Sequence, residues 1–162
     1  MLKNIEFYQD RYKGWIKSLI SGVSFFSNLK FNHLETIMQK VVQEDFDEET
    51  VLFTNGDSMD KIFILLNGEV QTYLSLPDEE LVLDVLNEPG CIFGESAFLN
   101  QKEAINCNLK VTKQARFIVI KKNVVRELCS KFPEIDKEYK LAGERITYLG
   151  FPILDYKVQH RR

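Results

Sequence analysis

A series of short apolar segments, separated by turn residues and flanked by helical stretches, limits what this chain can fold into. Between residues 45 and 120 the apolar residues alternate or run together briefly, and groups of Gly, Asn, Asp and Pro interrupt them. This spacing predicts about eight short strands. We therefore predict an α+β fold: an eight-stranded antiparallel β jelly-roll barrel with helices before it and two helices after it.

Turn residues mark the ends of the expected strands. Residues 61–66 are nearly all apolar, which predicts a strand buried on both faces. Asn67-Gly68 follows directly and is typical of a hairpin. A second turn at residues 112–114 is expected to join strands at 105–111 and 115–120.

The flanking stretches repeat their apolar residues every three or four positions, as helices do. Residues 1–24 are expected to form a helical lead-in, and Asn32 is expected to cap a helix over residues 33–43. Two helices are expected between residues 122 and 149, with a break at Phe132-Pro133. The predicted organisation is a lead-in (1–24), one domain (25–149) and a polar tail (150–162).

Composition argues against several classes of function. The net charge of −3 and the pI of about 5.5 argue against a nucleic-acid partner. The three cysteines and two histidines have neither disulfide-framework nor zinc spacing. No apolar run is long enough to span a membrane, and the N-terminus does not resemble a signal peptide. We expect reduced thiols, a cytoplasmic location and no tightly bound cofactor.

The segment Phe93-Gly94-Glu95-Ser96-Ala97 carries the strongest functional signal. Glycine lets a backbone approach a ligand closely. The N–H groups that open a helical turn attract an anion, and a glutamate can accept a hydrogen bond from a ribose hydroxyl. The segment is therefore a candidate ribose-phosphate site.

Taken together, these features resemble the cyclic nucleotide-binding domain family over residues 20–149. The anchors of the resemblance occur in the family's order: Gly56-Asp57, residues 62–65, Gly68-Glu69-Val70, Pro89-Gly90, Phe93-Gly94-Glu95, Phe117 and residues 128–133. The resemblance is strongest to the C-terminal domain of voltage-gated and cyclic-nucleotide-gated cation channels, of the potassium type, in which a helical linker from the pore enters the domain.

The resemblance implies a regulatory, non-enzymatic domain that couples binding of cAMP or cGMP to gating. Its partner would be the rest of a membrane channel, whose cytoplasmic face it would occupy, and it would assemble as a homotetramer through the lead-in helices. In that setting the phosphate-binding cassette is Phe93 to Ala97. Further implied contacts are Thr72, Val85, Ile105, Asn106 and, on the final helix, Arg145.

One departure from the family pattern weakens the expected binding. The family places an arginine about ten residues after the cassette glutamate, where its guanidinium pairs with the cyclic phosphate. Here that position holds Ile105, or Ala104 in an ungapped count, and Lys102 is the only cation nearby. Losing such a contact costs about 1.5–3 kcal/mol, or about one to two decades of affinity. We expect binding of cAMP or cGMP to be weak, altered or absent. The tail segment 151–156 is an alternative occupant of the pocket.

Each of these functional interpretations has a simpler structural alternative. Val85 and Thr72 could simply fill the barrel, and Arg145 could be a surface charge beside Glu144. At the level of the whole chain, the alternative to a channel fragment is a stand-alone sensor or scaffold with the same fold. A cupin-like metal enzyme lacks the clustered histidines it would need, and a transcription factor of the catabolite-activator type conflicts with the acidic charge and the absence of a recognition helix.

Overall fold

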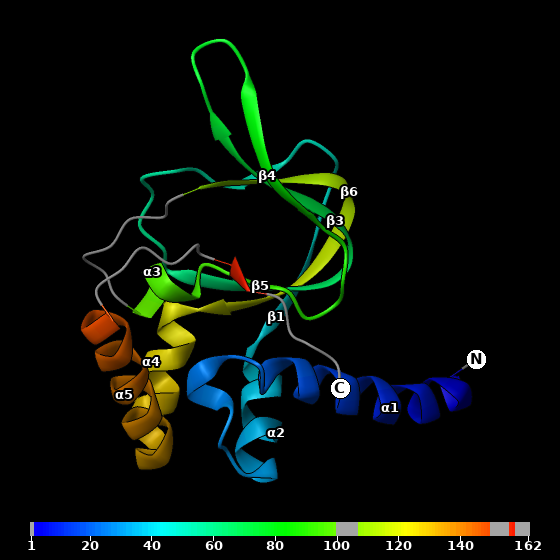
Figure 1. Ribbon diagram of the computed structural model, residues 1–162. Coiled ribbons are helices and arrows are strands. Elements are labelled where there is room, and N and C mark those ends of the chain that lie inside the picture. Colours follow the sequence, from blue (N-terminus) through cyan, green and yellow to red (C-terminus); the bar gives the residue numbers. More distant parts are fainter. Residues whose placement is uncertain (1, 100–106, 150–155, 158–162) are drawn as a thin grey trace.

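The computed structural model describes residues 2–99, 107–149 and 156–157, with the side chains of residues 11–95, 98–99 and 107–144. Figure 1 shows a curved sheet with most of the helices gathered at one end. The helical elements are α1 (Leu2–Ile20), the 3-10 turn η1 (Ser24–Phe26), α2 (Phe31–Lys40), α3 (Glu95–Leu99), α4 (Lys122–Lys131) and α5 (Pro133–Leu149). The break predicted at Phe132-Pro133 is confirmed, since α4 and α5 meet there.

The described strands form one antiparallel sheet. They are β1 (Val42–Phe46), β2 (Val51–Phe53), β3 (Lys61–Ser75), β4 (Glu80–Leu86), β5 (Ile92–Phe93), β6 (Asn108–Lys121) and β7 (Tyr156–Lys157). The pairing order is β1-β6-β3-β5-β7, with β2 also on β6 and β4 also on β3. The predicted mixture of helices and antiparallel strands is confirmed. The predicted closed barrel of eight strands is corrected to an open, curved sheet, because in the described part of the chain the ends of this path do not pair.

Two predicted turns are absent because β3 and β6 are long, continuous strands. Both halves of β3 pair with β6: Leu65 lies opposite Phe117 and Val70 opposite Val111. Gly68, between these halves, has a φ of +100°, and the register shifts around it. The Asn67-Gly68 pair therefore bends the strand at an irregularity instead of reversing the chain. The turn expected at residues 112–114 lies inside β6 for the same reason.

The boundaries of α2 also differ from the prediction. Its N-cap is Lys30, which makes no side-chain capping hydrogen bond, and Asn32 lies inside the helix. The helix ends at Lys40, and Val42 already pairs with Val119 in the sheet. Apolar residues at the end of a helical stripe fit a strand equally well, so the pattern could not place this boundary.

Residues 61–66 are nearly all apolar because β3 has a hydrophobic core on each of its two faces. Successive side chains of a strand point to opposite faces. Ile62, Ile64 and Leu66 belong to the core under the helices. Phe63 and Leu65 belong to a second core inside the curve of the sheet. The prediction of a strand buried on both faces is confirmed.

The second half of α1 packs as part of the domain. Ile16, Leu19 and Ile20 are buried in the same core as the outward-facing residues of β3. Lys17 forms an ion pair with Glu35 of α2. The end of the lead-in is therefore fixed to the helices and the sheet. None of the helices, over the residues described, is both long and apolar enough to cross a bilayer.

Candidate functional site

The predicted cassette forms one compact unit made of β5, Gly94 and α3. Phe93 is fully buried, and its ring packs edge-on against Phe117 of β6 at a centroid distance of 6.4 Å. Gly94 has a φ of +87°. A Cβ at this position would lie 2.9 Å from Cε of Met59 and 3.1 Å from the backbone oxygen of Lys61. The positive φ favours glycine at this position, and the Lys61 oxygen leaves little room for a side chain.

Glu95 connects the cassette to the end of the lead-in. Its side chain is largely buried, and Oε1 accepts a hydrogen bond from the backbone N–H of Ser24 at 3.0 Å. Ser24 opens η1, the turn between α1 and α2. The carboxylate that the family resemblance assigns to a ribose hydroxyl therefore already holds a backbone group 71 residues away in the sequence.

Removing this acceptor is expected to destabilise the protein. In Glu95→Ala the partly buried N–H of Ser24 loses its acceptor, which costs about 1–3 kcal/mol. Glu95→Gln keeps an acceptor oxygen and should lose less than half as much. Chemical denaturation of the two variants measures the difference. An alanine variant as stable as the wild type would contradict this role of the Ser24 contact.

The far end of α3 is held by Lys122, the first residue of α4. Its Nζ donates to the backbone oxygen of Phe98 at 2.6 Å and to the hydroxyl of Tyr139, on α5, at 2.7 Å. The ammonium group also lies 4.2 Å from the centre of the Phe98 ring. The Phe98 ring is fully buried, stacks on Phe25 of η1 and meets Tyr139 edge-on. One short helix thus contacts both the lead-in turn and the final helix.

Thr72 and Val85, the predicted base contacts, have different environments. Thr72 is fully buried, and its hydroxyl has no hydrogen-bond partner among the described residues. Since Val70, two positions earlier, belongs to the core inside the sheet, Thr72 faces the same interior. Val85 lies on β4 opposite Gln71 and is 50% exposed. The interpretation of Val85 as barrel filling is therefore wrong.

Several predicted contacts fall at the limits of the described structure. Ile105 and Asn106 lie outside the described residues. The backbones of Ser96 and Ala97 lie in α3 and that of Arg145 in α5, but their side chains are not described. The contacts assigned to these five residues stay predictions.

The tail reaches the cassette through the strand β7. Tyr156 pairs with Phe93 and Lys157 with Ile92, so β7 extends the sheet at β5. Residues 151–155 of the expected tail segment lie outside the described residues. The position of β7 places part of the tail beside the cassette backbone.

The cysteines show no sign of a reactive or metal-binding role. Cys91 and Cys107 are buried, and Cys129 is half-buried. Burial, assisted by the charge of Glu88, raises the pKa of Cys91 to about 11. Burial also raises the pKa of Cys129. Within the described residues, no group of three or more His, Cys, Asp or Glu side chains is placed to hold a metal ion.

Four residues that hold the cassette were not predicted from the sequence: Ser24, Phe98, Lys122 and Tyr139. Ser24 and Lys122 resemble ordinary loop and helix-start residues, and nothing in their local sequence points to a partner. Phe98 follows the cassette directly and is apolar inside a short helix, so its burial was a usable signal. Its contact with Tyr139 depends on how α5 packs, which spacing does not reveal.

Comparison with known proteins agrees with this geometry. Residues 43–132 match the model of the cyclic nucleotide-binding domain. A cyclic nucleotide-binding-like protein from Brucella abortus aligns with a TM-score of 0.63 and 17% identity, covering 70% of this chain and 97% of the other. The N-terminal domain of a transcriptional regulator from Streptomyces coelicolor aligns with a TM-score of 0.68 and 17% identity, covering 81% and 91%.

A third solved structure contains a ligand. The regulatory domain of Toxoplasma gondii PKA, determined with cAMP, aligns with a TM-score of 0.62 and 20% identity, covering 72% of this chain and 44% of that one. At these identities the structural matches establish the fold alone. No curated protein matches the chain significantly in sequence. The match to the family model spans more than half of the chain, and the chain belongs to the cyclic nucleotide-binding domain family.

Proposed function

We propose that this chain is a non-enzymatic regulatory module that senses a cyclic nucleotide and passes its occupancy to the helices that precede and follow the sheet in the sequence. The observation that carries the proposal is the position of α3. Glu95 at its start holds Ser24, and the backbone oxygen of Phe98 is held by Lys122. A ligand that moves α3 would act on both contacts.

The buried hydroxyl of Thr72 supports a ligand inside the sheet. A buried hydroxyl without a hydrogen bond costs free energy, and this one faces the same interior as Phe93. A nucleobase edge offers donors and acceptors that would satisfy it. The cAMP seen with the Toxoplasma regulatory domain belongs to a protein of the same fold, which favours a cyclic nucleotide as that ligand.

Competition for Glu95 supplies the switch. A ribose hydroxyl that donated to Oε1 of Glu95 would compete with the Ser24 N–H for that oxygen. The ligand would thereby favour a state in which the turn between α1 and α2 is released, which is a population shift. Because ligand binding and release of this turn are linked, a released turn should in turn raise affinity for the ligand.

Calorimetry with cAMP and cGMP up to millimolar concentration tests the proposal directly. We expect weak binding, because neither candidate position, Ala104 nor Ile105, can pair with the phosphate. Binding should also increase hydrogen exchange at the Ser24 amide. The absence of both a heat signal and a thermal shift, with either nucleotide, would contradict the sensing function.

Replacing Thr72 by valine separates ligand binding from folding. Thr72→Val removes a buried, unpartnered hydroxyl, so the free protein should become more stable by about 1 kcal/mol. Affinity for the nucleotide should fall about three- to tenfold. The matched control is Thr54→Val, on an exposed turn, which should change neither property. Unchanged affinity in Thr72→Val would remove this residue from the proposed site.

A second function, that of a ligand-independent scaffold, is favoured by β7. Its pairing with β5 places the tail beside Phe93. In this case the tail would replace the nucleotide, and a chain ending at residue 149 would gain affinity for cAMP. Both functions fit a stand-alone protein. The similar structures include a transcriptional regulator and a kinase regulatory domain, so they support that context better than a channel.

A further inference from the structure

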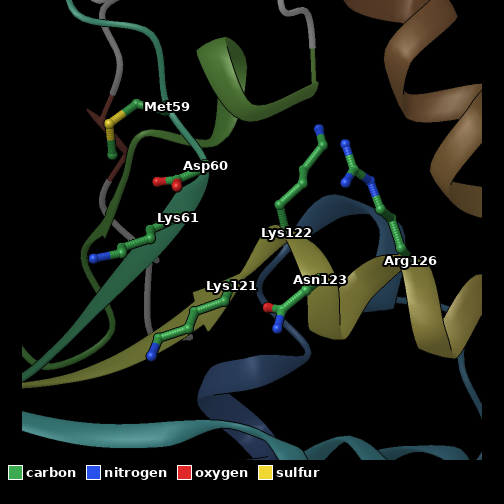
Figure 2. A pocket seen from close by; sticks show the side chains of 7 residues that line it. All are labelled: Met59, Asp60, Lys61, Lys121, Lys122, Asn123 and Arg126. Carbon is green, nitrogen blue, oxygen red and sulfur yellow. The ribbon is translucent and has the colours of Figure 1, made fainter.

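A pocket of about 310 Å³ lies behind the cassette, where β3 begins and β6 passes into α4. Met59, which contacts the Gly94 position, forms one wall, and Lys122, which holds α3, forms another. Figure 2 shows its lining residues: Met59, Asp60, Lys61, Lys121, Lys122, Asn123 and Arg126. Four of these side chains are cationic and one is acidic, although the whole chain has a net charge of −3.

The four cations form two repulsive pairs. Lys61 and Lys121 are directly opposite in the β3–β6 register, and like charges in that position destabilise a sheet. Lys122 and Arg126 are four residues apart on α4, where like charges destabilise a helix. In Figure 2 the first pair extends to one side of the pocket, and the second pair lies together on the other.

None of the four cations forms an ion pair with a protein carboxylate in the described part of the chain. Cations elsewhere on the surface, such as Lys40, Lys110 and Arg116, each form an ion pair with a carboxylate. For the four pocket cations, no carboxylate among the described residues lies at ion-pair distance. Lys122 instead donates to two neutral oxygens.

We propose that this pocket is an anion site, separate from the cassette, for a phosphate-bearing ligand that carries at least two negative charges. Arginine pairs with phosphate as a two-pronged donor, and Lys61 and Lys121 supply mobile point charges that can turn toward it. The ligand is either a free phosphorylated metabolite or a phosphorylated lipid headgroup, since both present the same chemistry. Because Met59 and Lys122 also contact the cassette, occupancy of this pocket would stabilise α3 in its observed position.

Inorganic pyrophosphate is the first probe, titrated into the 162-residue chain by calorimetry. The double variant Lys61→Gln/Arg126→Gln removes one charge from each side of the pocket and spares Lys122, which holds α3. It should weaken pyrophosphate binding at least about tenfold. The control, Lys113→Gln/Lys131→Gln, removes the same charge from two exposed lysines outside the pocket. It should bind within about twofold of wild type.

Phosphatidylcholine vesicles with and without a phosphoinositide distinguish the two ligand sources. Binding that needs the phosphoinositide and disappears in the pocket variant assigns the site to a lipid headgroup. A response to pyrophosphate without binding to the phosphoinositide vesicles assigns it to a soluble phosphate compound. No binding to either probe overturns the proposal.

Two comparisons between variants test whether net charge, or the segment that carries Lys102, accounts for pyrophosphate binding instead of the pocket. Equal weakening in the pocket and control variants overturns the proposal, because net charge would then account for binding. The proposal is also overturned if Lys102→Gln loses pyrophosphate binding while the pocket variant keeps it. The segment that carries Lys102, and not the pocket, would then hold the anion. Without ligand, the pocket variant should resist denaturant better than wild type. Lower resistance contradicts the repulsion that defines the site.

Discussion

Gly68→Ala is expected to cost a large part of the stability of this protein. A Cβ at Gly68 would lie 2.5 Å from Cα and 2.6 Å from Cβ of Ala115, and it would also overlap the backbone oxygen of Gln114. The φ of +100° adds strain for any residue with a side chain. Because the obstacles are mainly backbone, they cannot move aside cheaply. The combined cost is about 3–5 kcal/mol, of a total that is typically about 5–15 kcal/mol.

Two other glycines separate the causes of that cost. Gly56 has a similar φ of +97°, but a Cβ there would meet nothing within 4 Å. Gly56→Ala therefore isolates the conformational strain and should cost about 1–2 kcal/mol. Gly14 lies on the exposed surface of α1, also in open space. Gly14→Ala should stabilise the protein by about 0.5–1 kcal/mol.

Urea denaturation of the three variants provides the measurement. The expected order of unfolding midpoints is Gly14→Ala, wild type, Gly56→Ala and then Gly68→Ala. Equal losses at Gly68 and Gly56 would show that the close approach of β3 and β6 contributes nothing. In that case the bend in β3 would depend on backbone conformation alone.

Phe117→Ala is expected to have the second largest effect. Phe117 is fully buried inside the curved sheet, and its ring packs edge-on against Phe46, Phe63 and Phe93. Removing it leaves a cavity where rings from four strands meet. Truncation of a buried phenylalanine costs about 3–5 kcal/mol. Because Phe93 belongs to the cassette, the loss should also loosen the candidate ligand site.

Phe31→Ala is the matched control, since Phe31 is 70% exposed and packs against Lys17 as a cation–π contact. It should cost no more than about 1 kcal/mol. Thermal unfolding measures stability in both variants, and hydrogen exchange of residues 92–99 reports the state of the cassette. A Phe117 variant that unfolds like the Phe31 variant would exclude a central packing role for this ring.

Much of the fold could be predicted from local patterns. The break at Phe132-Pro133 and the doubly buried strand at residues 61–66 follow from proline chemistry and from the alternation of side chains along a strand. The hairpin at Asn67-Gly68 was wrong for a physical reason. The glycine signal reports a positive φ, which a bend in a continuous strand uses as readily as a tight turn.

The candidate site likewise has one part that the sequence predicts and another that it does not. The sequence alone determined the cassette, because Gly94 and its neighbours meet local backbone demands that only certain residues satisfy. The tertiary structure decided the partners of the cassette: Ser24 for Glu95, Lys122 for Phe98, and the cationic pocket behind Gly94. These contacts join residues far apart in the chain. Periodicity and turn chemistry act over a few residues, so only the packing of the helices on the sheet could bring these residues together.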